Sequence, residues 1–216
     1  MPPPPTDPEL ALAARTWRLA LLATADTETA RRALATLATV PPNEPLPLDR
    51  IDRLAIQAIR RAVPPARRRN LAQADAAPEP SAPSAPPAQA RDSIGPAHDV
   101  IASLPLQAAE AFILRRLDDL DPICACRAMD CSRSAADRFL ERADAALASA
   151  FGPDRAAAAL HDLRAGAESL APSPEVVAAC LAKAHARHKA RVTTWIAATA
   201  AALLLVFLIL AAIASQ

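Results

Sequence analysis

The chain has 216 residues with a formal net charge of +1, 22 prolines, three glycines and only 3% aromatic residues. This balance excludes a strongly basic surface over the whole chain, typical of nucleic-acid binding, and an acidic one suited to a charged substrate. Abundant alanine with little glycine favours helices over strands, so we expect an all-α fold with cores of Leu, Ile, Val and Ala.

A small N-terminal helical unit is predicted over 9–63, after a Pro-rich tail at 1–8 that we expect to be disordered. The first helix spans about 9–24. Asp26 can cap a second helix, which the run PPNEPLPL ends, and a third follows over about 48–63. The predicted buried stripe of the first helix is Leu10, Ala13, Ala14, Trp17 and Leu21.

The composition changes over 64–98, where the chain is rich in Pro and Ala and includes AAPEPSAPSAPPAQA. Such a segment cannot bury enough apolar surface to fold, so we predict a disordered linker that lets the flanking units move. The three arginines at 67–69 indicate a solvated helix end, with a nucleic-acid or anionic-lipid contact as the alternative.

A second helical domain is predicted over 99–151, and its centre has the pattern of a helix-turn-helix. Asp121 is a natural N-cap and Pro122 a natural first residue for a short helix. Asp130 tolerates a turn conformation, and Ser132 can cap the following helix. In such a unit the second helix presents its N-terminal residues to the DNA major groove. The candidate DNA-binding residues are therefore Ser132, Arg133, Ser134, Arg138 and Arg142.

Residues 104–147 resemble a known family. The order of an opening Leu104-Pro105, the run AFILR, the turn DCS and the helix FLERA is similar to the C-terminal promoter-reading domain of sigma-70 family, extracytoplasmic-function-type sigma factors. The segments TWRLALLA and RIDRLAIQAIRRA are only faintly similar to that family's other conserved domain. The resemblance implies bacterial RNA polymerase and promoter DNA as partners.

The segment also departs from that family. Where the family's recognition helix usually has Lys, Ser and Arg, this chain has Asp137, Arg138 and Phe139, and Asp130 replaces the turn glycine. Residues 104–147 contain eight acids against six bases, a net charge of −2, which predicts weak binding to DNA phosphates. No aromatic residue lies between Trp17 and Phe112, so nothing there could hold unstacked bases. The alternative is an alanine-rich bundle that only looks like a helix-turn-helix.

The C-terminal part is predicted to be a helical stalk over 152–192, followed by a single transmembrane helix over 193–214. Ser173, Pro174 and Glu175 begin a helix that no breaker interrupts, and the stretch WIAATAAALLLVFLILAAIA has the length of a membrane span. The alternative is a buried helix of a soluble domain. Basic residues before the span predict that the N-terminal part lies in the cytoplasm, and the resemblance to sigma factors implies the bacterial cytoplasmic membrane. This membrane flank comprises Lys183, Arg187, Lys189, Arg191 and Trp195.

Nothing in the sequence indicates an enzyme, a cofactor or a small-molecule substrate. The C-x-C-x4-C set and Cys180 have no His or CxxC spacing of a structural zinc site, so we interpret the cysteines as small buried hydrophobes rather than metal ligands. Asp118, Asp119 and Asp121 are interpreted as solvated helix-end residues.

Two functions remain open from the sequence. The first is a membrane-anchored sigma-factor-like transcription regulator whose divergent helix-turn-helix contacts DNA or polymerase. The second is a membrane-anchored protein-interaction module, facing the cytoplasm, that has lost DNA binding and binds another regulatory protein.

Overall fold

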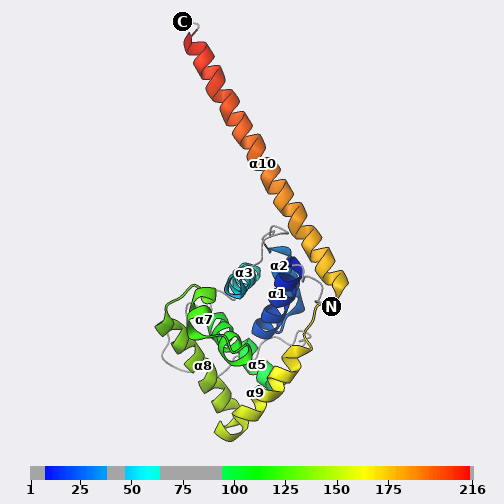
Figure 1. The fold of residues 1–216 in the computed structure, drawn as a ribbon, viewed down its shortest axis with the longest axis vertical. Coiled ribbons are helices and arrows are strands. Elements are labelled where there is room, and N and C mark those ends of the chain that lie inside the picture. Colours follow the sequence, from blue (N-terminus) through cyan, green and yellow to red (C-terminus); the bar gives the residue numbers. More distant parts are fainter. Residues whose placement is uncertain (1–7, 38–46, 64–93, 215–216) are drawn as a thin grey trace, which may run out of the picture.

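The computed structural model describes residues 8–37, 47–63 and 94–214, and every regular element among them is helical, which confirms the all-α fold (Figure 1). The N-terminal tail over 1–7 and the linker residues 64–93 lie outside the described residues. A packed body is followed by one long helix that projects away from it (Figure 1).

The N-terminal unit consists of α1 (Pro8–Thr24), α2 (Thr27–Ala35) and α3 (Leu48–Ala62). The Asp26 side chain caps α2 by accepting the Glu28 N–H at 3.0 Å. The predicted stripe of α1 was partly wrong, because Leu10 is 52% exposed whereas Leu12 and Leu19 are buried. The physical reason is that α1 is central and packs against helices on several sides, among them α2, α3, α5 and α6.

The second unit comprises α5 (Pro96–Ser103), α6 (Leu106–Phe112), the π-helical turn η1 (Ile113–Leu117), α7 (Pro122–Met129) and α8 (Arg133–Phe151). Helix α5 begins inside the segment predicted to be linker. Its His98 is fully buried, with Nε2 2.9 Å from the Leu21 carbonyl and Nδ1 accepting the Ile94 N–H at 3.3 Å. The C-terminal end of that predicted linker is therefore part of the packed core.

The π-helical turn η1 continues α6 with a wider hydrogen-bond pattern. The Asp118 N–H donates to the Ile113 carbonyl five residues earlier at 3.0 Å, and the Leu120 N–H donates to the Leu114 carbonyl at 2.9 Å. Single π turns of this kind insert one extra residue into a helix. Asp119 follows with φ of 49°, and α7 begins three residues later at Pro122.

The two units pack into one continuous core, whereas the sequence predicted a linker that lets them move. Helix α3 contacts α7, and α1 contacts α5 and α6. Buried apolar residues from both units belong to a single cluster, which includes Trp17, Leu34, Ile59, Phe112 and Leu147. Arg60 also forms a bidentate pair with the buried Glu110, at 3.1 and 2.6 Å. The apolar surface buried between the two units stabilises their packing against each other, although the connection between them is long.

Helix α9 (Pro153–Glu168) belongs to the body rather than to a stalk. It packs against α8 and α5 and buries Leu163 and Ala167. The final helix, α10 (Pro174–Ala214), begins as predicted, with the Val176 N–H donating to Ser173 Oγ at 3.3 Å.

Helix α10 runs without a break for 41 residues. Its first turns pack mainly against α2 and bury Val177, Cys180 and Ala184, and the described residues of 185–203 are exposed. Among the described residues, no helix has both the length and the apolar character needed to cross a membrane. Much of the segment predicted to be the anchor falls on residues 201 and 204–214, whose side chains lie outside those that the structure describes.

Candidate nucleic-acid interface

The first helix of the candidate helix-turn-helix, α7, begins where the sequence predicts. Asp121 accepts the backbone N–H groups of Ile123 and Cys124 at 2.9 and 3.1 Å, and Pro122 is the first helical residue. Hydrogen bonds from the Cys124 thiol and from these two backbone N–H groups lower the pKa of Asp121. The ionised carboxylate of Asp121 also interacts favourably with the positive end of the α7 dipole.

The turn between α7 and α8 is a Schellman-type helix end. Asp130 has φ of 55° and ψ of 48°, the left-handed conformation expected from the sequence. The Cys131 N–H donates to the Cys126 carbonyl at 3.2 Å, and the Asp130 N–H donates to the Arg127 carbonyl at 3.3 Å. Ser132 then caps α8 by accepting the Ala135 N–H at 3.3 Å. Hydrogen bonds within a few residues therefore define where α7 ends and α8 begins.

The five candidate DNA-binding residues lie on one exposed surface, which we call the α8 face. Ala136, Ala143 and Leu147 form the buried side of α8. The exposed side presents two neighbouring rows at a spacing of four residues. One row, with no acidic residue, consists of Ser134, Arg138 and Arg142. The other row has mixed charge and consists of Arg133, Asp137 and Glu141.

The α8 face is only partly electropositive. Arg133 lies 4.0 Å from Asp137, and the two side chains are 71% and 53% exposed. Farther along α8, Asp144 forms a bidentate pair with Arg116 of η1, at 3.2 and 2.6 Å. Arginine suits phosphate because its planar fork donates two parallel hydrogen bonds. Asp137 and Glu141 would face the same phosphates and weaken binding by like-charge repulsion.

The cysteines near the turn do not form a metal centre in the described part of the chain, where no group of three potential ligands is found. Cys124, Cys126 and Cys131 are half-buried, whereas only Cys180 is buried as predicted. Burial and the neighbouring Cys126 raise the pKa of the Cys131 thiol. This favours the unreactive thiol over the thiolate that binds metals.

The aromatic residue of the N-terminal unit is unavailable to nucleic acid. Trp17 is only 7% exposed and belongs to the common core, and it is the sole aromatic residue before Phe112. Capture of unstacked bases depends on an accessible aromatic face. The N-terminal unit therefore provides no stacking platform for opened DNA.

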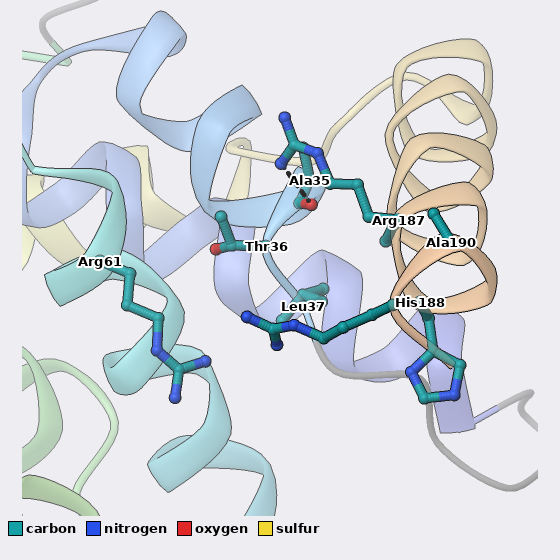
Figure 2. Close-up of a pocket in the computed structure, with 9 residues that line it drawn as sticks. Ala35, Thr36, Leu37, Arg61, Arg187, His188 and Ala190 are labelled. Carbon is teal, nitrogen blue, oxygen red and sulfur yellow. Dashed lines mark hydrogen bonds between the residues drawn. The ribbon is translucent and has the colours of Figure 1, made fainter. Parts of the chain in front are cut away.

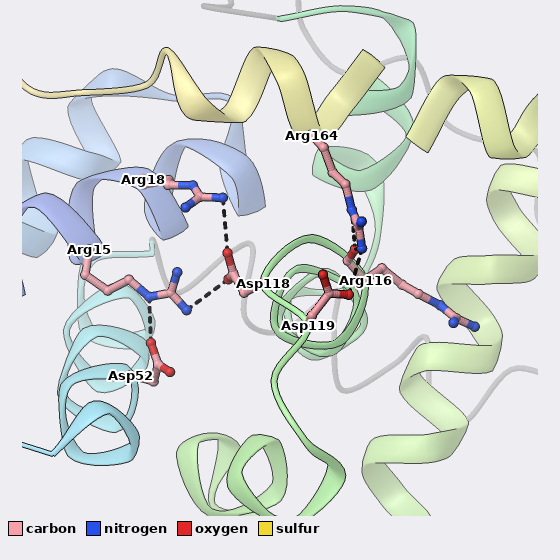
Figure 3. Close-up of polar contacts among 7 residues, drawn as sticks. All are labelled: Arg15, Arg18, Asp52, Arg116, Asp118, Asp119 and Arg164. Atoms are coloured by element: carbon pink, nitrogen blue, oxygen red, sulfur yellow. Dashed lines mark hydrogen bonds and ion pairs between the residues drawn. The ribbon is translucent and has the colours of Figure 1, made fainter. Parts of the chain in front are cut away.

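One site that sequence reasoning missed is an ion cluster between the two units (Figure 3). Asp118 was expected to be a solvated helix-end residue, yet its side chain is only 8% exposed. Its oxygens lie 2.9 Å from Arg15 Nη2 and 3.1 Å from Arg18 Nη2, and Arg15 also donates to Asp52 at 2.6 Å. The neighbouring Asp119 meets the expectation, because it is 73% exposed and pairs with Arg164 at 2.8 Å. The available signal was the presence of two arginines, Arg15 and Arg18, within the mostly apolar α1.

The membrane-flank residues lie on α10, all of them exposed: Lys183, Arg187, Lys189, Arg191 and Trp195. Arg187 Nη1 also donates to the Ala35 carbonyl at the end of α2, at 3.1 Å. The flank is thus attached to the body on one side.

No protein-family model matches the chain, no curated protein matches its sequence, and no solved structure matches its fold. The resemblance of 104–147 to sigma factors accordingly depends on the residues alone.

Proposed function

We propose that this chain is a membrane-anchored, sigma-factor-like transcription regulator that contacts DNA or RNA polymerase through the α8 face. One observation carries the proposal. A capped short helix, a left-handed turn at Asp130 and a second helix capped by Ser132 expose Arg133, Arg138 and Arg142 on one side. The opposite side of α8 is buried in the core, so the arginine-bearing side is the one available to a partner.

The proposed role is regulation rather than promoter opening. Trp17 is buried, and the acids Asp137 and Glu141 lie among the arginines of the α8 face. Both features support a protein that binds duplex DNA weakly or meets polymerase, without holding separated strands. Weak binding is compatible with a tethered protein, because tethering raises the local concentration of a site that can reach its partner.

The anchor in this proposal is the segment 193–214, which places the chain in the bacterial cytoplasmic membrane with its body in the cytoplasm. The sequence from Trp195 to Ala214 contains no charged residue, and about 20 apolar residues match the hydrocarbon thickness of a bilayer. Helix α10 carries the basic flank directly into this segment without a break. Positive charge beside a span remains on the cytoplasmic side.

The proposal is tested by DNA binding of the full-length chain in detergent. Fluorescence anisotropy with a random-sequence duplex would be recorded over a series of salt concentrations. Replacing Arg133, Arg138 and Arg142 by Ala should reduce the salt slope by about three, since each lost phosphate contact contributes about 0.9.

The matched control removes the same charge elsewhere, with Arg31, Arg50 and Arg155 replaced by Ala on the exposed surfaces of α2, α3 and α9. It should leave both affinity and slope unchanged. Duplex binding that the α8 triple variant does not alter would refute a role for the α8 face. Absence of binding to both DNA and polymerase at low salt would refute the proposal.

The second candidate is a membrane-anchored protein-interaction module that has lost DNA binding. It is favoured by the Arg133–Asp137 pair and by Glu141, which give the α8 face the mixed charge of a polar protein surface. Affinity capture from solubilised membranes would separate the two candidates. Recovery of polymerase subunits supports the regulator, whereas recovery of a different regulatory protein, lost when Asp137→Arg reverses a charge, supports the interaction module.

A further inference from the structure

An open cavity of about 790 Å³ lies where α10 leaves the body, between this helix and the ends of α2 and α3 (Figure 2). Ala35, Thr36 and Leu37 form its floor at the end of α2. Arg61 extends from the last turn of α3 on one side, and Arg187 extends from α10 on the other (Figure 2). The cavity is large enough for a lipid headgroup, since small-molecule sites typically measure about 300–1,000 Å³.

The lining of this cavity carries charge of one sign. Arg61, Arg187, His188 and Arg191 contribute to it, and none of the described residues that line it is acidic. Glu9 is an acidic residue near α10, and its Oε1 lies 3.2 Å from His185 Nε2. Neither Glu9 nor His185 lines the cavity. A cleft lined by one sign of charge concentrates the electric field and attracts a counter-ion.

Arg187 is held in place before any ligand arrives. Its Nη1 donates to the Ala35 carbonyl at 3.1 Å, which uses one of the five N–H donors of a guanidinium group. The two carbonyls before Ala35 that accept at this helix end already have partners. The Thr36 N–H donates to the Ala33 carbonyl at 3.0 Å, and the Leu37 N–H donates to the Leu34 carbonyl at 3.2 Å. The remaining donors of Arg187 can therefore serve an anion without first being reorganised.

The position of the cavity along α10 indicates the source of the anion. Arg191 and Arg187 precede Trp195 by four and eight residues, which correspond to about 6 and 12 Å along a helix. The polar headgroup layer beside the hydrocarbon core is about 5–8 Å thick on each side. With the anchor in a bilayer, Arg191 lies within the headgroup layer, and Arg187 lies a few ångströms outside it, where its bond to the Ala35 carbonyl holds it at the cavity.

We propose that this cavity binds the phosphate headgroup of an anionic membrane lipid, held between Arg61 of α3 and Arg187 and Arg191 of α10. The inference deepens the membrane-anchored function proposed above and rests on it. A bound headgroup would join α3 to α10, so the lipid would fix the direction in which the anchor leaves the body.

The test uses the full-length chain in a neutral detergent, with dioctanoyl-phosphatidylglycerol as the probe and dioctanoyl-phosphatidylcholine and inorganic phosphate as comparisons. Binding would be followed as the rise in the thermal unfolding temperature with ligand concentration. Phosphatidylglycerol should stabilise the protein, and phosphatidylcholine should not. The double variant Arg187→Gln with Arg191→Gln should raise the half-saturating concentration at least about tenfold, because each charge-assisted hydrogen bond contributes substantially to binding.

The matched control is Lys183→Gln with Lys189→Gln, which removes the same charge from exposed positions on the same helix that do not line the cavity. It should bind phosphatidylglycerol like the original chain. Arg191→Gln alone leaves the Arg187–Ala35 bond intact and should still weaken binding, which guards against misfolding of the double variant.

Four results would overturn the proposal: no response to phosphatidylglycerol, an equal response to inorganic phosphate, equal losses in the arginine and lysine variants, or duplex DNA displacing the lipid from the same residues. Short-chain lipids bind without a bilayer, so this outcome is independent of anchoring. Flotation of the original chain with vesicles tests the anchor separately, and its failure would refute the membrane location while the lipid titration still reports on the cavity.

Discussion

Asp118 and Asp119 are adjacent carboxylates in opposite environments, and they provide a direct test of how the two helical units are held together. Asp118→Asn keeps the shape of the side chain but removes its charge. Arg15 and Arg18 then lose a partner at 2.9 and 3.1 Å, while their side chains remain only 19% and 29% exposed. Breaking a buried ion pair costs about 3–5 kcal/mol.

The expected loss lies at or below the low end of that range. Arg15 keeps its bond to Asp52 at 2.6 Å, and both guanidinium groups retain some contact with water. We therefore expect Asp118→Asn to lower the free energy of unfolding by about 2–3 kcal/mol. With a denaturant slope of about 2 kcal/mol per molar, the urea midpoint should fall by about 1–1.5 M.

The assay is urea unfolding of the full-length chain in detergent, followed by far-ultraviolet circular dichroism. Asp119→Asn is the control, because its surface pair with Arg164 should contribute less than about 1 kcal/mol, and Asn tolerates its positive φ. A loss below about 0.5 kcal/mol for Asp118→Asn, or equal losses for both variants, would refute the reasoning.

Three further changes test other parts of the structure. Phe112→Ala should cost about 3–5 kcal/mol because Phe112 is 1% exposed in the common core; a normal thermal unfolding temperature would contradict this. Ser132→Ala should cost about 1 kcal/mol by removing the cap of α8. Ser134→Ala should cost less in the same urea assay, because its hydroxyl lies 3.2 Å from Ser132 Oγ but does not itself cap a backbone N–H. Burial raises the pKa of Glu110 above 4.5 despite its pair with Arg60. The folded state then retains a proton that the unfolded state releases, so stability should fall as pH rises from about 4.5 through the folded pKa. Glu110→Gln should abolish this pH dependence of the urea midpoint. An unchanged pH dependence in the variant would refute the role of Glu110.

The helix boundaries could be predicted where one or two neighbouring residues decide them. Asp121 with Pro122, the left-handed Asp130 and the Ser132 cap depend on backbone chemistry within a few positions, and the structure has all of them. The α8 face follows from the same caps, because they set which side of α8 is buried. Sequence alone could therefore predict which residues the α8 face exposes, and their binding of DNA stays a prediction.

The contacts between the two units could not be predicted in the same way. Asp118 and its partners Arg15 and Arg18 are about a hundred positions apart, and no local rule links residues at that separation. His98 illustrates the same limit, since it follows a Pro-rich segment and yet bonds to the Leu21 carbonyl. Tertiary packing determines both, as it determines that α9 folds back onto α5 and α8.

The π-helical turn at Ile113–Leu117 has a consequence for how this chain tolerates insertion and deletion. A π turn accommodates one residue more than an α-helix would at the same length. Deleting one residue there would return the segment to regular α geometry. Four residues of α-helix turn through about the same angle as the five residues of this π turn, so Asp118 would keep its direction toward the two arginines of α1. The π turn thus absorbs a surplus residue without changing the register of the ion cluster. A one-residue deletion there should be tolerated, whereas a deletion in the regular part of α6 would rotate Asp118 by about 100° around the helix axis, away from the two arginines.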